Sequence, residues 1–131
     1  AHPGPDLAAQ TSSALAILSL VFRQDEPAYA DVLLRHPREL YDFAQATRAP
    51  ETPTDKSLGR YSDSILDARS YYASTSGAQD ALPWAAAWLY RATSEARYLH
   101  DAEADYTRVA DNTGHTAWTA VWDDVRYGLY F

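Results

Sequence analysis

The sequence predicts an all-α protein built from helical hairpins, and three observations carry this prediction. Apolar residues recur at helical spacing through most of the 131-residue chain. Proline, glycine and small polar residues gather at the breaks between these segments. A helix that is apolar all round is followed twice by a helix that is apolar on one side. A two-layer ring of hairpins requires this alternation, because its inner helices are buried and its outer helices are half exposed.

The first hairpin is expected over residues 5–48, with Pro5 in the first turn. Its first helix consists mostly of alanine, leucine and isoleucine, with small serine and threonine residues between them. Apolar groups on nearly every face are typical of a buried helix. Its second helix begins at Pro27 and is apolar on one side only. Pro37 falls inside that second helix, so we expect a kink or a split near His36.

The second hairpin is expected over residues 79–110 and repeats the same alternation. Its first helix holds Trp84 and Trp88, which are four residues apart and are therefore expected to pack together in the core. Two polar segments at about 49–78 and 111–124 are too long for tight connections. Long ordered loops in compact domains often carry function. We therefore interpret both segments as cleft loops. Within the first of them, residues 49–59 are expected to be a solvated insertion and residues 61–76 a wall of the cleft.

Composition excludes several classes of function. The chain has 11 basic and 18 acidic residues and a net charge of −7. A single lysine and scattered arginines do not form the basic cluster that nucleic acids or anionic membranes require. No apolar run reaches the roughly 20 residues of a membrane span, and the absence of cysteine excludes disulfides and thiolate chemistry. Neutral polymers such as polysaccharides remain compatible with this composition.

The ends of the chain suggest that it belongs to something longer. The sequence contains no methionine and finishes in an apolar aromatic run over residues 127–131. A free terminus is usually polar and frayed. We therefore expect the chain to be an internal segment of a larger protein.

Three stretches carry a specific order of residues: HPGPDLAAQTSSALAILSLVF at 2–22, YSDSILDARSYYASTSGAQDALPWAAAWLYRAT at 61–93 and TAWTAVWDDVRYG at 116–128. Together they resemble glycoside hydrolase family 9, the inverting cellulases built on an (α/α)6 barrel. The likeness runs in order over nearly the whole chain. It implies that residues 1–131 are the central segment of a catalytic domain, and hence an incomplete part of this toroid of helical hairpins.

The resemblance also implies where substrate binds. Tyr72 stands in the family's aromatic pair and would line the subsites for a sugar chain. Trp118 stands at the family's sugar-stacking tryptophan, and Asp124 is the second member of its acidic pair. These three residues are the expected substrate-binding positions, and the expected partner is a β-1,4-glucan.

A calcium ion beside the cleft is a further implication of the resemblance. Its expected ligands are Ser76 and Gly77, through their carbonyl oxygens, and the carboxylates of Asp80 and Asp123. The family's glutamate in this site is replaced by Ala81. Calcium affinity falls as carboxylates are lost, so we expect weak binding.

No catalytic residue is assigned. An inverting glycosidase needs a general base and a general acid about 6.5–9.5 Å apart across the scissile bond. In the resembled family the base comes from an upstream Asp-x-x-Asp motif and the acid is a downstream glutamate, and this chain contains neither. Asp123 and Asp124 are neighbours in sequence and cannot flank a glycosidic bond.

The expected function is that of a fragment of an extracellular endoglucanase-type hydrolase, to which this segment supplies cleft walls and a possible calcium site. A non-catalytic glucan-binding or scaffold protein on the same toroid is the alternative. The replacements at Ala78 and Ala81 would suit that alternative. A third possibility is another helical-toroid enzyme that acts on polysaccharide. The sequences that flank this segment would separate the enzyme from the binding protein.

Overall fold

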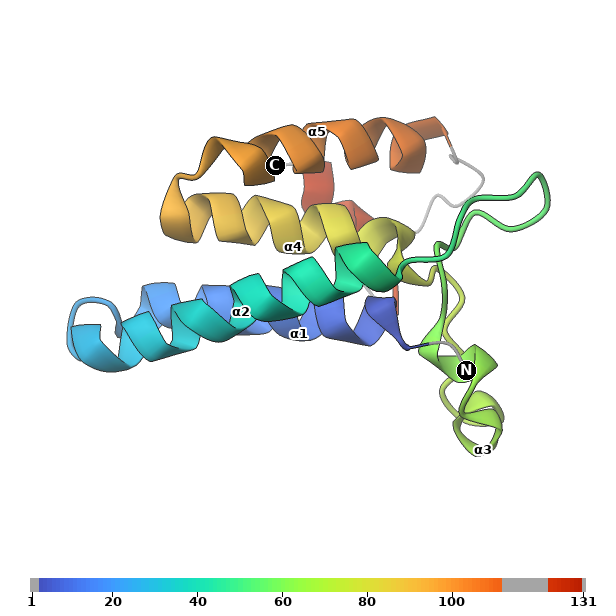
Figure 1. Cartoon of the computed structure of the whole chain (residues 1–131), viewed down its shortest axis with the longest axis horizontal. Coiled ribbons are helices and arrows are strands. Elements are labelled where there is room, and N and C mark those ends of the chain that lie inside the picture. The colour runs from blue at the N-terminus through green and yellow to red at the C-terminus, as the bar shows by residue number, and fades with distance from the viewer. Residues whose placement is uncertain (1–2, 112–122, 131) are drawn as a thin grey trace.

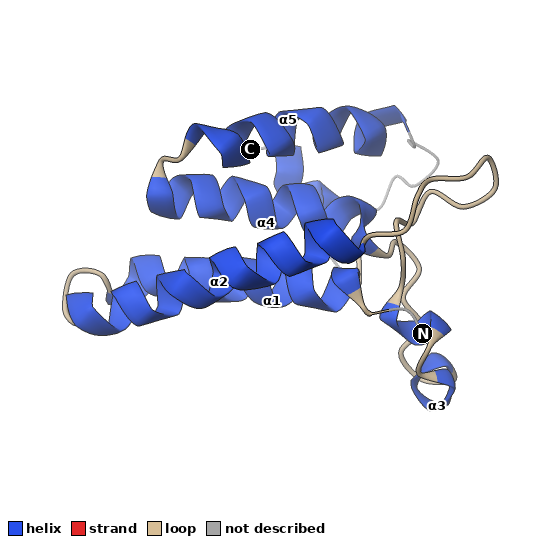
Figure 2. Cartoon of the chain, in the orientation of Figure 1, coloured by secondary structure: helices blue, strands red, loops and turns tan. Residues whose placement is uncertain are grey.

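The computed structural model describes residues 3–111 and 123–130 of the chain. Four long helices form two hairpins, as Figures 1 and 2 show, and short helical turns lie in the connections. The all-α class predicted from the sequence is confirmed for this described part. The long helices are α1 (Pro5–Phe22), α2 (Pro27–Thr47), α4 (Ala78–Thr93) and α5 (Ala96–Asp111), and the short ones are η1 (Tyr61–Asp63), α3 (Leu66–Arg69) and η2 (Arg126–Tyr130).

Helices α1 and α4 form the inner pair of the arrangement. Helix α1 packs against both α2 and α4, and α4 packs in turn against α5 (Figure 1). The residues buried along α1 and α4 are mostly small, and small side chains let two helix axes approach closely. The core is therefore built largely from alanine: Ala8, Ala9, Ala16, Ala78, Ala81, Ala85, Ala86 and Ala92, with Leu82 and Leu89.

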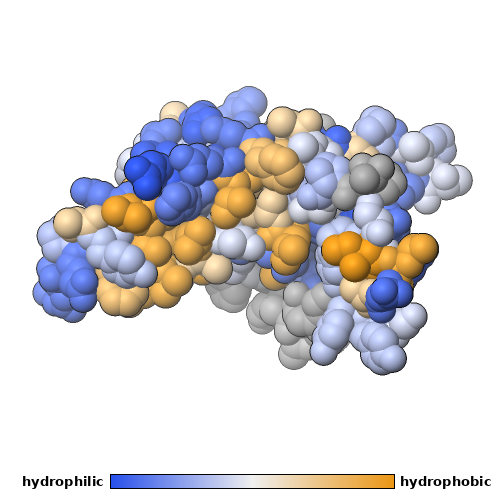
Figure 3. Space-filling view, turned by 60° about the horizontal axis from the view of Figure 1, so that its bottom comes forward, coloured by the Kyte–Doolittle hydropathy of each residue, from blue (hydrophilic) through white to orange (hydrophobic). Residues whose placement is uncertain are grey.

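One face of α1 is exposed in the described chain, whereas its sequence is typical of a helix that is buried on nearly every side. Leu7, Leu18 and Val21 are 55%, 41% and 63% exposed. Figure 3 brings the lower side of Figure 1 forward and shows apolar residues gathered along the helical body. The physical reason is that α2 and α4 together cover only part of the circumference of α1. An exposed apolar face of this kind calls for another packing partner.

The isolated 131-residue chain is therefore expected to aggregate or to behave as a molten species. The exposed apolar face of α1 lacks the partner that would remove it from water. The hairpin of α4 and α5 does not cover this face, and a small core adds too little stability to offset its exposure. Circular-dichroism melting combined with size-exclusion chromatography checks this expectation. A sharp cooperative transition in a monomeric sample would contradict it.

Helix α2 runs without interruption through Pro37, so the predicted split near His36 does not occur. Pro37 is fully buried, and its carbonyl oxygen accepts a hydrogen bond of 2.7 Å from the Ser12 hydroxyl on α1. Packing against α1 holds the helix together at this point. The cost of a proline in a helix interior is thus offset by tertiary contacts.

A pair of buried tyrosines connects the two outer helices. Tyr41 on α2 and Tyr98 on α5 meet edge to face, with ring centroids 5.4 Å apart. The Tyr41 hydroxyl donates to Asp101 at 3.0 Å and accepts from the Gln45 side chain at 2.7 Å. Burial raises the pKa of Tyr41 well above its usual value. The hydroxyl therefore stays protonated and keeps its role as a donor.

Helix α1 is the one segment of the described chain that is long and apolar enough to cross a membrane on length and composition alone. This differs from the sequence-based expectation, in which no apolar run reaches the roughly 20 residues of a membrane span. In the structure 44% of this helix is buried against the rest of the molecule. The core helix of a globular protein passes the same criteria.

Candidate functional site

The residues singled out by sequence converge on one end of the molecule. The N-terminal ends of α1 and α4 lie at this end, together with the long connection from α2 to α4 (Figure 1). That connection first makes an extended loop and then a small lobe with η1 and α3, before it enters α4. Every predicted site residue that the structure describes lies in this lobe, at the start of α4 or just before η2.

The start of α4 is capped by backbone carbonyls of the preceding loop. The Ala78 amide donates to the carbonyls of Ser57 at 2.7 Å and Gly59 at 3.1 Å, and the Gln79 amide donates to Ser57 at 3.1 Å. Gly77 precedes them with φ 68° and ψ −143°, a conformation that only glycine adopts readily. A Cβ atom on Gly77 would lie 2.5 Å from the Ser57 carbonyl oxygen. Gly77 thus has a structural role besides the metal-binding role implied by the resemblance.

This contact also corrects the expectation for the preceding loop. The segment 49–59 reads in sequence as a solvated insertion, but Ser57, Leu58 and Gly59 are buried against the start of α4. Leu58 adopts a positive φ of 59°, which is uncommon for a residue with a side chain. Such strain is typical of a turn held in place by its surroundings.

Asp80 lies fully buried in the first turn of α4. Its Oδ2 atom accepts a hydrogen bond of 2.7 Å from the Val125 amide, whereas its Oδ1 atom is buried without a hydrogen-bond partner in the described part of the chain. Burial raises the pKa of Asp80 to about 6, and the nearby Asp124 carboxylate adds to this shift. The hydrogen bond from the Val125 amide acts in the opposite direction.

Asp123 is tied to the loop that precedes α4. Its Oδ2 atom accepts from the Thr75 amide at 2.6 Å and from the Thr75 hydroxyl at 2.5 Å. Its backbone carbonyl accepts a hydrogen bond from the Ser76 hydroxyl. The structure thus places the four predicted calcium ligands around the start of α4. Among the described residues, however, no three histidine, cysteine or acidic side chains form a group that could hold a metal ion.

Asp124, an expected substrate-binding residue, is engaged within the protein. Its Oδ1 atom accepts from the backbone amide of Arg126 at 3.1 Å and from the Arg126 Nε at 2.8 Å. The second carboxylate oxygen accepts from the same guanidinium group. Asp124 therefore stabilises the start of η2 and neutralises Arg126.

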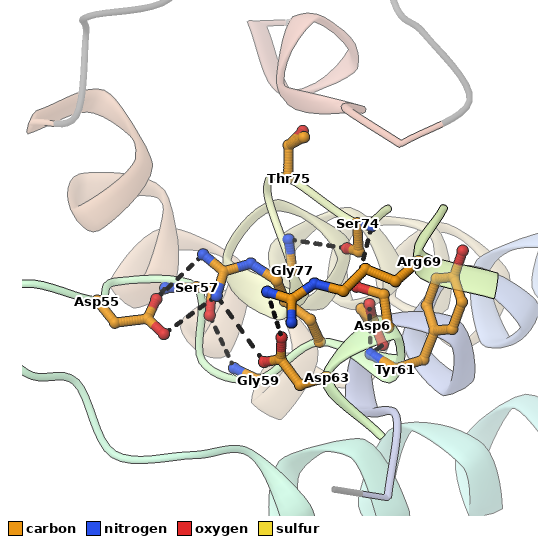
Figure 4. A network of polar contacts seen from close by, with 12 residues as sticks. Asp6, Asp55, Ser57, Gly59, Tyr61, Asp63, Arg69, Ser74, Thr75 and Gly77 are labelled. Carbon is orange, nitrogen blue, oxygen red and sulfur yellow. Dashed lines mark hydrogen bonds and ion pairs between the residues drawn. The ribbon is translucent and has the colours of Figure 1, made fainter. Parts of the chain in front are cut away.

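A cavity of about 300 Å³ lies between the lobe and the start of α1. Tyr72 lines it and is 63% exposed, so its ring is accessible from solvent. The Tyr61 hydroxyl donates to the Tyr72 carbonyl. The Tyr61 amide donates to the buried Asp6 carboxylate at 3.0 Å and 3.1 Å (Figure 4). These contacts attach the lobe to α1. Besides these residues, the lining includes Leu7, Gln10, Ala68 and Asp123.

Charged side chains stabilise the outer side of the lobe. Arg60 donates to both carboxylate oxygens of Asp55, at 3.0 Å and 3.1 Å, and lies 3.9 Å from Asp63. Arg69 approaches Asp63 from the other side at 3.9 Å (Figure 4). The backbone amide of Ser57 and the Arg60 guanidinium lower the pKa of Asp55 to about 2.

Sequence reasoning missed the polar residues that connect these parts, chiefly Asp6, Ser74 and Thr75. Ser74 accepts from the Gly77 amide at 3.2 Å, and its own amide donates to Ser62 at 3.1 Å. The only local signal was a run of small polar residues before a helix, which is typical of a turn. Trp118, the remaining substrate-binding prediction, lies outside the described residues.

Comparison with known proteins gives a consistent result over the whole chain. The family model described as "Glycosyl hydrolase family 9" matches residues 1–131. Endoglucanase B of Cellulomonas fimi is 42% identical over 98% of this chain, which corresponds to 12% of that protein. Endoglucanase 2 of Oryza sativa subsp. japonica is 48% identical over 90% of this chain and 16% of its own length.

Solved structures agree with these relatives. The endoglucanase of the termite Nasutitermes takasagoensis superposes with a TM-score of 0.82 at 42% identity, over 97% of this chain and 26% of that protein. The catalytic domain of Clostridium thermocellum CelT gives a TM-score of 0.73 at 33% identity, over 97% of this chain and 23% of that domain. The chain therefore spans about a quarter or less of each of these similar proteins.

Proposed function

This chain belongs to glycosyl hydrolase family 9, and on that basis we propose that it is part of an endoglucanase-type enzyme that cleaves β-1,4-glucan with inversion. Its two hairpins are a segment of an (α/α)6 barrel, as in the matching endoglucanase structures. The observation that carries the proposal is the match along the entire chain to endoglucanases in both sequence and structure. An extracellular site of action goes with the same proposal.

In this proposal the segment binds and orients the glucan but does not carry out the chemistry. Inversion requires one carboxylate that activates water and one carboxylic acid that protonates the leaving oxygen. Three acidic residues at the loop end of this segment are engaged within the protein: Asp6 holds Tyr61, Asp123 holds Thr75 and Asp124 holds Arg126. We propose that the acid and the base come from other parts of the polypeptide.

The accessible ring of Tyr72 supplies the binding surface. A pyranose presents a flat face of C–H groups, which packs well on an aromatic ring while its hydroxyl groups stay hydrogen-bonded at the rim. Tyr72 lines the cavity beside α1, and 63% of this residue is exposed to solvent, which leaves ring surface for such a contact. We propose that Trp118 forms a second platform of this kind.

Activity on a β-1,4-glucan tests the proposal directly. The complete protein that carries this segment is incubated with a soluble cello-oligosaccharide, and proton NMR follows the anomer released first. Inversion at a β-linkage releases the α-anomer, which then equilibrates in water. Release of the β-anomer would contradict inversion. Binding without hydrolysis would favour the glucan-binding alternative, which the loss of a carboxylate at Ala81 supports.

Replacement of Tyr72 with alanine is expected to weaken the binding of cello-oligosaccharides about two- to tenfold, since a stacked ring contributes about 0.5–1.5 kcal/mol. The melting temperature should stay unchanged because the side chain is mostly exposed. Tyr71→Ala is the matched control, as Tyr71 is the adjacent tyrosine, is 83% exposed and does not line the cavity. Isothermal titration calorimetry measures both variants. Equal losses of affinity in the two variants would remove Tyr72 from the binding surface.

We also propose that calcium binds weakly at the start of α4. The buried Oδ1 atom of Asp80 fits a cation, because it is an acceptor that lacks a hydrogen-bond donor in the described part of the chain. The carbonyls of Ser76 and Gly77 and the carboxylate of Asp123 would complete the ligand set. A calcium ion there would hold the loop before α4 against the segment before η2. Two carboxylates make a low-affinity site, because calcium affinity depends on ligand charge.

A further inference from the structure

Two segments that are far apart in sequence are joined directly at the start of α4. Thr75 donates to the Asp123 carboxylate through both its amide, at 2.6 Å, and its hydroxyl, at 2.5 Å. The Ser76 hydroxyl donates to the Asp123 carbonyl, and the Val125 amide donates to Asp80 at 2.7 Å. We call these four hydrogen bonds the Thr75 clasp. They span 45 to 48 residues of sequence.

The clasp involves the same acidic residues that would hold a calcium ion. We propose that this chain joins its two cleft segments through the Thr75 clasp, and that their closure does not depend on calcium. A bound cation would neutralise Asp80 and Asp123 and pull their segments together. In this chain N–H and O–H donors from the opposite segment hold the two carboxylates in place of the ion, although these neutral donors leave their charge unchanged. The inference rests on the family assignment alone and not on the proposed activity.

The electrostatics of the clasp support this assignment. Hydrogen bonds to an ionised carboxylate are about twice as strong as those between neutral groups. Asp123 receives two of them on one oxygen atom, and Asp80 receives one from a backbone amide that cannot move independently of η2. Asp123 is thus bound by the loop before α4, and Asp80 is bound by the segment before η2.

The residue at position 81 points to the same conclusion. Ala81 is fully buried in the alanine-rich core between the helices. A glutamate at this position would place a carboxylate in a site without water, which is unfavourable unless a cation compensates its charge. With alanine the core is apolar at this position. The contact between the loop before α4 and the segment before η2 is then made by the clasp.

The test compares melting temperatures of the complete protein in excess EDTA and in excess calcium chloride. For the unaltered protein we expect melting temperatures within about 1 °C of each other, because a weakly bound ion adds little to the stability of the folded state. Thr75→Val removes the hydroxyl donor and is expected to lower the melting temperature by about 2–4 °C in both, whereas Thr75→Ser, which keeps the hydroxyl, should retain it. Ala81→Glu is the positive control for calcium sensitivity. It should melt earlier in EDTA and recover when calcium is added, because a ligand that binds only the folded state stabilises it.

Several results would overturn the inference. A melting temperature of the unaltered protein that falls in EDTA and returns with calcium would show that the ion makes the closure. An unchanged melting temperature in Thr75→Val would show that the clasp contributes nothing. If Ala81→Glu does not fold, calcium titration calorimetry on the unaltered protein decides the question, since tight binding contradicts the proposal and weak or absent binding supports it. The hydrolysis assay is separate, so failure here leaves the proposed activity intact.

Discussion

Replacement of Gly77 with alanine is expected to destabilise the protein by about 3–6 kcal/mol, which combines backbone strain with a steric collision. The backbone at Gly77 has a positive φ, and a Cβ atom there would lie 2.5 Å from the Ser57 carbonyl oxygen and 2.8 Å from that of Gly59. Neither carbonyl can retreat, because both accept hydrogen bonds from the first amides of α4. Melting of the complete protein, together with hydrogen exchange at the Ala78 and Gln79 amides, measures the effect.

Gly4→Ala is the matched control for this prediction. Gly4 also has a positive φ, of 69°, but the atom nearest to a Cβ there would be the Tyr61 Cβ at 3.2 Å, and the other neighbours lie at 3.7 Å or more. It lies in the left-handed helical region, where alanine costs about 1–2 kcal/mol. The excess loss in Gly77→Ala therefore reports the collision with the capping loop. Equal losses in the two variants would show that the Ser57–Gly59 turn is free to move.

Replacement of Tyr98 with alanine is expected to cost about 3–5 kcal/mol, as large aromatic truncations in a core do. Tyr98 is fully buried, its ring packs edge to face on Tyr41, and the Arg97 guanidinium lies 4.2 Å from its ring centroid. Truncation leaves a cavity between the outer helices and unsupported ion pairs around it. Denaturant unfolding of the complete protein measures the change in free energy.

Tyr98→Phe serves as the control because it keeps the ring and removes only the hydroxyl that accepts from Arg97. We expect it to cost about 1 kcal/mol, the usual contribution of one hydrogen bond. A small loss in Tyr98→Ala would mean that α2 and α5 close over the cavity. In that case the tyrosine pair would not be the element that holds the two hairpins together.

The prediction of the helices from sequence was successful because their signals are local. The period of apolar residues and the prolines at Pro5 and Pro27 are read within a few turns of chain, and the structure has α1 and α2 beginning at these residues. The amphipathic character of α5 follows from the same kind of pattern. The expected break at Pro37 does not occur, because packing against α1 offsets the cost of a proline inside the helix. Local sequence does not reveal this packing.

The site was predicted less completely because its contacts are not local. Family resemblance selected Tyr72, Asp80 and Asp123, but residue types alone do not show which group a buried carboxylate faces. Thr75 gave no signal, since its partner lies 48 residues away. The close approach of the Ser57 carbonyl, which requires glycine at position 77, could not be predicted for the same reason.

By itself, the sequence determined the helical class, the alternation of apolar and one-sided helices, and the family to which the chain belongs. These properties depend on spacing and residue order, which are written directly in the chain. Only the tertiary structure decided which face of α1 remains uncovered, how α4 is capped and how Asp123 is held. The physical reason is that hydrogen bonding and burial depend on which distant segments meet, and that is settled by the packing of whole helices and loops.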